Sequence, residues 1–75
     1  MKEMVEIIAS SIVDRPKEVE VTEEKDGDSI RIRLTVADDD MGKVIGKQGR
    51  IARAIRKVVN AAAAKADKEV KVDIR

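Results

Sequence analysis

The sequence predicts an α+β fold with the element order α-β-β-α-α-β. Residues 29–37 and 69–75 alternate apolar and polar side chains with the two-residue period of a strand. Residues 50–66 repeat their apolar side chains at helical spacing, and Asp26-Gly27 is a turn signal between two alternating segments. Because two helices precede the last strand, we expect a three-stranded mixed sheet with the helices packed on one face. With 75 residues, the chain is predicted to form one domain over residues 1–75.

The first helix is predicted over residues 3–13. Its apolar side chains share one face at a spacing of three or four residues: Met4, Val5, Ile7, Ile8 and Ile12. Pro16 ends the helix, because the residue before a proline avoids the α region. We interpret this helix as part of the core and assign it no ligand.

Two strands are predicted next, joined by a hairpin. Residues 17–25 alternate around Val19 and Val21 and form a charged strand. Asp26-Gly27 marks the tight turn, because glycine tolerates the positive φ that such a turn needs. In the strand over residues 29–37, four apolar side chains point the same way: Ile30, Ile32, Leu34 and Val36.

Three consecutive aspartates, Asp38 to Asp40, follow this strand. Carboxylates can bind hard cations, but three acids on an extended segment alternate in direction and no further ligand is suggested nearby. We favour a cap, in which an aspartate accepts hydrogen bonds from the free N–H groups of a short helix over residues 39–45. No metal site is predicted.

Gly46-Lys47-Gln48-Gly49 separates this short helix from the long one. Without Cβ atoms, Gly46 and Gly49 allow positive φ and let the backbone of a polymer come close. The long helix that follows directs its free N–H groups and positive dipole end at the same place. Lys47 and Arg50 add full positive charges. A phosphate-bearing chain is the ligand that uses all of these features. The glycine spacing does not match the GxxxxGK[ST] loop of nucleotide triphosphatases, in which Ser or Thr stands in place of Gln48.

The charge distribution supports a polyanion site. The net charge is only +1, but residues 41–66 hold seven cations and no acid: Lys43, Lys47, Arg50, Arg53, Arg56, Lys57 and Lys65. The rest of the chain holds nine cations and all 15 acids. Such an asymmetry is typical of a surface that binds nucleic acid.

The long helix over residues 50–66 separates apolar from basic side chains. One arc is apolar and consists of Ile51, Ile55, Val58, Val59, Ala62 and Ala66. The opposite arc consists of Arg50, Arg53, Arg56 and Lys57. A solvated cationic face is the alternative, but the absence of acids on that face favours binding. Residues 61–64 are all alanine and leave a thin helix, which motivates the hypothesis of self-association through this face.

The composition excludes several classes of function. The chain has no Cys, His, Phe, Tyr or Trp, so disulfides, the commonest metal ligand and base stacking on aromatic rings are absent. Ser10, Ser11 and Ser29 have no histidine to activate them, so we expect neither an enzyme nor a cofactor. Without a long apolar run, we expect no membrane partner and a cytoplasmic location.

The segment from Asp40 to Ala52, DMGKVIGKQGRIA, resembles the GxxG loop of KH domains. It is most similar to small bacterial single-domain KH proteins of the KhpA type. One difference from the broader KH pattern is Ala52, where many KH domains have a large aliphatic residue. The resemblance implies a type II (prokaryotic) KH fold and a loop that clamps the backbone of about four nucleotides of single-stranded RNA.

The resemblance also implies a cellular role. We expect an RNA chaperone or post-transcriptional regulator. The alternative is an assembly subunit that acts mainly as a homodimer, or as a heterodimer with a larger KH-containing protein, in bacterial cell growth, cell shape or division.

We place the RNA across the loop. The predicted RNA-binding residues are Lys43, Val44, Ile45, Gly46, Lys47, Gln48, Gly49, Arg50, Ile51, Arg53 and Lys57. Backbone N–H groups at Lys47, Gln48 and Gly49 are expected to meet phosphates. The bases are expected on an apolar groove between the helices of residues 46–55 and the second strand, where Ile32 or Leu34 joins the lining.

Arg31 and Arg33 have two open interpretations. Both point away from the apolar side of the second strand. They can pair with first-strand acids such as Glu18, Glu20 or Glu23, or they can contact RNA. We favour the ion pairs.

Overall fold

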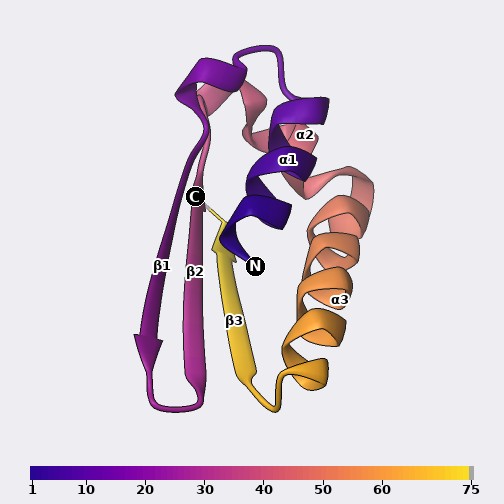
Figure 1. The fold of residues 1–75 in the computed structure, drawn as a ribbon. Helices are drawn as coiled ribbons and strands as arrows, with labels where there is room; N and C mark the ends of the chain where they lie inside the picture. The colour runs from indigo at the N-terminus through magenta and orange to yellow at the C-terminus, as the bar shows by residue number, and fades with distance from the viewer. Residues whose placement is uncertain (75) are drawn as a thin grey trace.

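The computed structural model describes residues 1–74 and has the predicted α+β architecture. The elements are α1 (Lys2–Ile12), β1 (Glu20–Asp26), β2 (Ser29–Thr35), α2 (Met41–Ile45), α3 (Arg50–Lys65) and β3 (Glu69–Ile74). Short 3₁₀ turns at Pro16–Glu18, Asp38–Asp40 and Lys47–Gly49 lie between them. The helices cover one face of the sheet, and the other face is open (Figure 1). The predicted order α-β-β-α-α-β is confirmed.

The three-stranded sheet is mixed, with the order β1-β2-β3. β1 runs antiparallel to β2, and β2 runs parallel to β3. β2 and β3 are parallel because the α2–α3 crossover returns the chain to the end of the sheet at which β2 begins. β2 is therefore the central strand, while β3 is an edge strand beside α3 (Figure 1).

The predicted limits of the first hairpin need correction. β1 begins at Glu20 rather than at residue 17, because Pro16–Glu18 forms a 3₁₀ turn, whose first position suits the fixed φ of proline. The turn itself is Gly27-Asp28 rather than Asp26-Gly27, because Asp26 still pairs with Ser29. Gly27 has a φ of 61°, as a tight hairpin turn requires.

The core fills the space between the sheet and the helices. The largest fully buried apolar side chains are Ile32, Leu34, Ile55, Val5, Val44 and Val59. β2 supplies the two from the centre of the sheet, and each helix supplies at least one of the others. Within residues 1–74, no helix combines the length and the hydrophobicity needed to cross a bilayer.

Both long helices are rotated relative to the prediction. α3 buries Ala52, Ile55, Val59 and Ala63. Val58 is 45% exposed and Ala66 is exposed, so their predicted place on the inner arc was wrong. α1 buries Val5 and Ala9 and leaves Ile7 67% exposed. In both cases alanine takes a central inner position, because a small side chain lets the helix pack closely against its neighbours.

Candidate nucleic-acid interface

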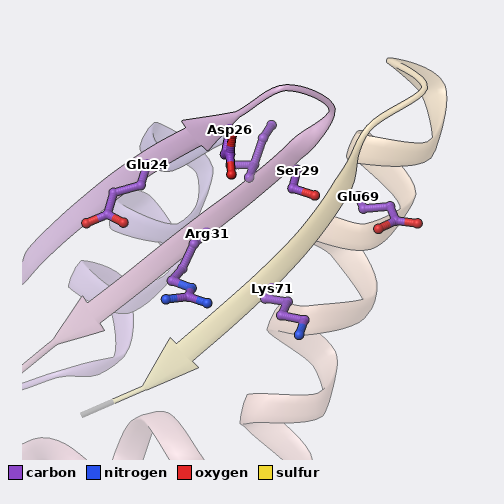
Figure 2. Close-up of a pocket in the computed structure, with 7 residues that line it drawn as sticks. Glu24, Asp26, Ser29, Arg31, Glu69 and Lys71 are labelled. Atoms are coloured by element: carbon purple, nitrogen blue, oxygen red, sulfur yellow. The ribbon is translucent and has the colours of Figure 1, made fainter.

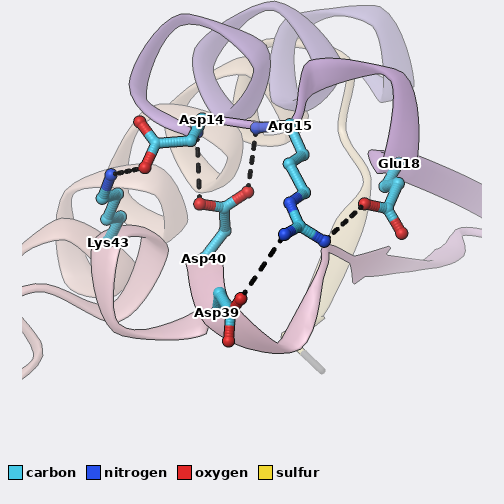
Figure 3. A network of polar contacts seen from close by, with 6 residues as sticks. All are labelled: Asp14, Arg15, Glu18, Asp39, Asp40 and Lys43. Atoms are coloured by element: carbon cyan, nitrogen blue, oxygen red, sulfur yellow. Dashed lines mark hydrogen bonds and ion pairs between the residues drawn. The ribbon is translucent and has the colours of Figure 1, made fainter.

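A buried carboxylate precedes α2 and joins it to the α1–β1 connection. Asp40 is 1% exposed. Its Oδ1 accepts a hydrogen bond from the Asp14 N–H at 3.1 Å, and its Oδ2 accepts one from the Arg15 N–H at 3.0 Å (Figure 3). Asp40 makes no capping hydrogen bond to α2, so the predicted cap was wrong. The carboxylate instead satisfies two N–H groups of a connection that has left its helix.

Ion pairs surround the hydrogen bonds from Asp14 and Arg15 to Asp40, which we call the Asp40 clamp. The Arg15 guanidinium lies 3.5 Å from a Glu18 carboxylate oxygen and 3.6 Å from one of Asp39 (Figure 3). The Lys43 Nζ donates a hydrogen bond to Asp14 Oδ2, and this bond raises the pKa of Lys43 above its ordinary value. Although acids gather here, residues 1–74 contain no group of three side chains placed to hold a metal ion.

The GxxG loop is built from left-handed backbone. Gly46, Gln48 and Gly49 have φ values of 76°, 58° and 75°. A Cβ on Gly46 would lie 2.4 Å from Ile51 Cγ1 and 2.9 Å from the Ile51 backbone N. A Cβ on Gly49 would meet no atom within 4 Å. Gly46 is thus required by the protein's own packing, whereas Gly49 borders open space that a ligand backbone can approach.

The loop's N–H groups differ in availability. The Gly49 N–H donates to the Gly46 carbonyl oxygen at 3.1 Å, and the Arg50 N–H donates to the Lys47 carbonyl oxygen. The Gly49 N–H is therefore already paired, contrary to the expectation that it meets a phosphate. Within residues 1–74, the N–H groups of Lys47 and Gln48 donate to no backbone carbonyl.

The basic side chains in the loop and after it are exposed. Lys47, Arg50, Arg53 and Lys57 all reach solvent. None of these four cations has a carboxylate oxygen within 4.0 Å among the described residues. These positive charges start at the loop and continue along α3, an arrangement of the kind that neutralises successive phosphates in nucleic-acid-binding proteins.

Three side chains that were predicted to line a groove beside β2 are not accessible to a ligand. Ile32, Leu34 and Val44 are fully buried, with 0% exposure, because β2 lies in the centre of the sheet beneath the helices. These three side chains shape the core and present no surface to a base. Ile45, at 38% exposure, and the half-buried Ile51 are the apolar residues next to the loop that reach the surface. Ala52, the departure from the broader KH pattern, is buried at 5% exposure.

The structure has a groove at a different strand. A hollow of about 290 Å³ lies between α3 and the edge strand β3, and it is lined by Arg56, Asn60, Val70, Lys71, Val72 and Asp73. Arg56 Nε donates to the Val72 carbonyl oxygen at 3.4 Å across this groove. The sequence interpretation had placed Arg56 on the basic arc of the long helix but had not singled out the other five. The position of the last strand after the crossover was the signal that could have identified them.

Arg31 and Arg33 lie on the open face of the sheet, which carries none of the helices. In the register, Arg31 faces Glu24 and Lys71, and Arg33 faces Thr22 and Asp73. Arg31 borders a hollow of about 370 Å³ on this face (Figure 2). Neither arginine forms an ion pair within residues 1–74.

Arg31 does face a first-strand acid, Glu24, but the three acids given as examples are not partners of these arginines. Glu20 pairs with Thr35, and Glu18 lies outside the strand. Glu23 stands between Thr22 and Glu24 in β1, so the strand alternation turns it to the other face.

Comparison with known proteins identifies the family. The family model described as "KhpA/KhpB, KH domain" matches residues 2–74. The RNA-binding protein KhpA of Clostridium perfringens is 61% identical over 74 residues, which cover 99% of each chain. The RNA-binding protein KhpA of Halalkalibacterium halodurans is 57% identical over 74 residues, 99% of this chain and 97% of its own. No solved structure matches significantly. The chain belongs to the KhpA/KhpB family of KH domains.

Proposed function

We propose that this protein binds single-stranded RNA as one KH domain over residues 1–75, with the Gly46–Gly49 loop clamping the phosphate backbone. The observation that carries the proposal is the combination of left-handed loop backbone with exposed cations that have no carboxylate within 4.0 Å in the described part of the chain. RNA, rather than another polyanion, is supported by the relatives named RNA-binding protein KhpA. The family is not a class of enzymes, in agreement with the sequence expectation.

The loop binds the phosphates of the RNA. The N–H groups of Lys47 and Gln48 donate to phosphate oxygens, and the open space beside Gly49 lets the RNA backbone approach. Lys47 and Arg50 neutralise the nearest phosphates. Arg53 and Lys57 continue the contact along α3, so the RNA runs from the loop along this helix.

The bases occupy the side of α3 that faces β3. Ile45 and Ile51 provide apolar surface next to the loop. Beyond them, the groove places Asn60 and Arg56 beside β3, which pairs with another strand only through its β2 side. The free backbone groups of an edge strand can hydrogen-bond to base edges. Because these contacts are aliphatic or made by backbone, we expect modest sequence discrimination.

The experiment is fluorescence anisotropy of a labelled single-stranded RNA of about 12 nucleotides, longer than the four that a KH loop clamps. Lys47→Asp/Gln48→Asp reverses the loop charge and should weaken binding on the order of 100-fold at low salt. Lys2→Asp/Ser11→Asp makes the same charge change on exposed positions of α1 and serves as the matched control. Wild-type binding should weaken steadily with salt, because counterions are released. Equal losses in the two double variants would overturn the proposal.

The finer role follows from this mode of contact. A protein that holds backbones with little sequence preference can act as an RNA chaperone or post-transcriptional regulator on many transcripts. Strand annealing of two complementary RNAs should be faster with wild-type protein than with Lys47→Asp/Gln48→Asp.

The second candidate function is assembly, as a homodimer or with a larger KH-containing protein in cell growth, shape or division. Val58 is 45% exposed on α3, next to exposed Ala61 and half-buried Ala62. These side chains form an apolar strip, although the prediction had included Ala63, which is buried. Sedimentation equilibrium should show a dimer that Val58→Glu converts to a monomer. A wild-type monomer at high micromolar concentration would remove the homodimer.

A further inference from the structure

Lys43 differs from the other cations of residues 41–66. Of the seven cations in this segment, it alone has a carboxylate partner within 4.0 Å among the described residues, namely Asp14. It lies in α2, four residues before Lys47 in the chain, and α2 leads directly into the loop. The sequence analysis had placed Lys43 among the RNA-binding residues, but its ammonium group is directed at Asp14 (Figure 3).

Asp14 is held in place for this contact. Its backbone N–H donates to the buried Asp40, and the neighbouring Arg15 N–H donates to the other oxygen of the same carboxylate. The side chain of Asp14 is 77% exposed and takes no part in the clamp. It presents a carboxylate to Lys43 as a phosphate oxygen would, because both are anionic oxygen acceptors for an ammonium donor.

We propose that Asp14 is an internal competitor of RNA that occupies Lys43 and thereby lowers the affinity of the loop for phosphate. This inference rests on the proposed function and deepens it. Removing the Asp14 charge frees Lys43 to contact one more phosphate at the entrance of the loop. The phosphate track of the wild-type protein therefore starts at Lys47.

The expected effect is modest. The Lys43 and Asp14 side chains are 44% and 77% exposed, and exposed ion pairs are weak because solvent screens them. Freeing Lys43 should tighten RNA binding about two- to fivefold at low salt. One added phosphate contact should also steepen the slope of log K against log salt by about 0.7.

The test compares Asp14→Asn with wild type by anisotropy of the same labelled RNA over a salt series. The backbone N–H that Asp40 binds is kept in this variant, so the clamp survives; Asp14→Ala provides a second variant with the same charge change. Asp28→Asn is the matched control. Asp28 is 87% exposed and lies 3.4 Å from Lys68. It belongs to the β1–β2 turn, and this turn lies at the opposite end of the molecule from α2 (Figure 1).

Tighter and more salt-sensitive binding by both Asp14 variants, but not by Asp28→Asn, is the expected result. Lys43→Gln should then weaken Asp14→Asn more than it weakens wild type. If wild type binds through its loop and the Asp14 variants bind no tighter than Asp28→Asn, the competitor is overturned and the proposed function stands. If neither wild type nor the Asp14 variants bind, both proposals are overturned.

Discussion

The two ends of α2 use their charges in opposite ways. Before the helix, Asp40 and Arg15 direct their charges at partners within the chain. After the helix, Lys47 and Arg50 are exposed and have no carboxylate within 4.0 Å among residues 1–74. The first end fixes where α2 begins, and the second is left available to a ligand. An absent partner does not by itself mark a binding charge, because Arg31 and Arg33 on the open sheet face also have no ion-pair partner within residues 1–74.

The sharpest contrast inside the loop is between its two glycines. Gly46→Ala combines a positive φ with a Cβ that would lie 2.4 Å from Ile51, so we expect a loss of about 2–5 kcal/mol in the free energy of unfolding. Gly49→Ala has the strained φ but open space around the new Cβ, and should lose about 1–2 kcal/mol. Urea unfolding measures both. Equal losses would mean that contact with Ile51 does not constrain the loop.

The second largest loss of stability is expected when the Asp40 clamp is removed. Asp40→Ala leaves the N–H groups of Asp14 and Arg15 without their acceptor, and we expect a loss of about 2–3 kcal/mol in unfolding free energy. The neighbouring Asp39 is exposed and holds only the Arg15 ion pair, so Asp39→Ala should change stability by less than about 1 kcal/mol. If the two variants unfolded at the same urea concentration, the clamp would have no structural role.

The smallest expected effects come from removing one positive charge, either from α3 or from the open face of the sheet. Arg53→Gln should remove about 0.7 from the salt slope of RNA binding, because one phosphate contact is lost. Arg31→Gln removes the same charge from the open sheet face and should leave the slope unchanged. The slope is read from anisotropy at several salt concentrations. If Arg31→Gln changed the salt slope more than Arg53→Gln, RNA would bind to the open face of the sheet and not to α3.

The sequence predicted the order of elements because each element has a clear period, and it predicted the loop because GxxG is a local motif. It did not predict contacts between distant segments. Asp40 looks like a cap in sequence, but its partners lie 25 and 26 residues away. The inner face of α3 was misjudged because Val58 is more hydrophobic than Ala52 and Ala63, yet the close packing of the helix selects the small residues.

The predicted lining of the base-binding groove beside β2 was incorrect for a related reason. Alternation within β2 shows which side chains are apolar, but only the strand order shows that β2 is central and that β3 lines the exposed edge. Paired positions such as Lys43 and Asp14, 29 residues apart, are likewise invisible to local pattern.

The most direct test of the central claim is an amide NMR titration of the ¹⁵N-labelled protein with unlabelled single-stranded RNA. We predict the largest shift changes at Lys47 and Gln48, smaller ones along the α3 face that starts at Arg50 and at the β3 edge, and none at Arg31 on the open sheet face. Shift changes confined to the open sheet face, with the amides of the Gly46–Gly49 loop unmoved, would contradict the assignment of this loop as the phosphate clamp.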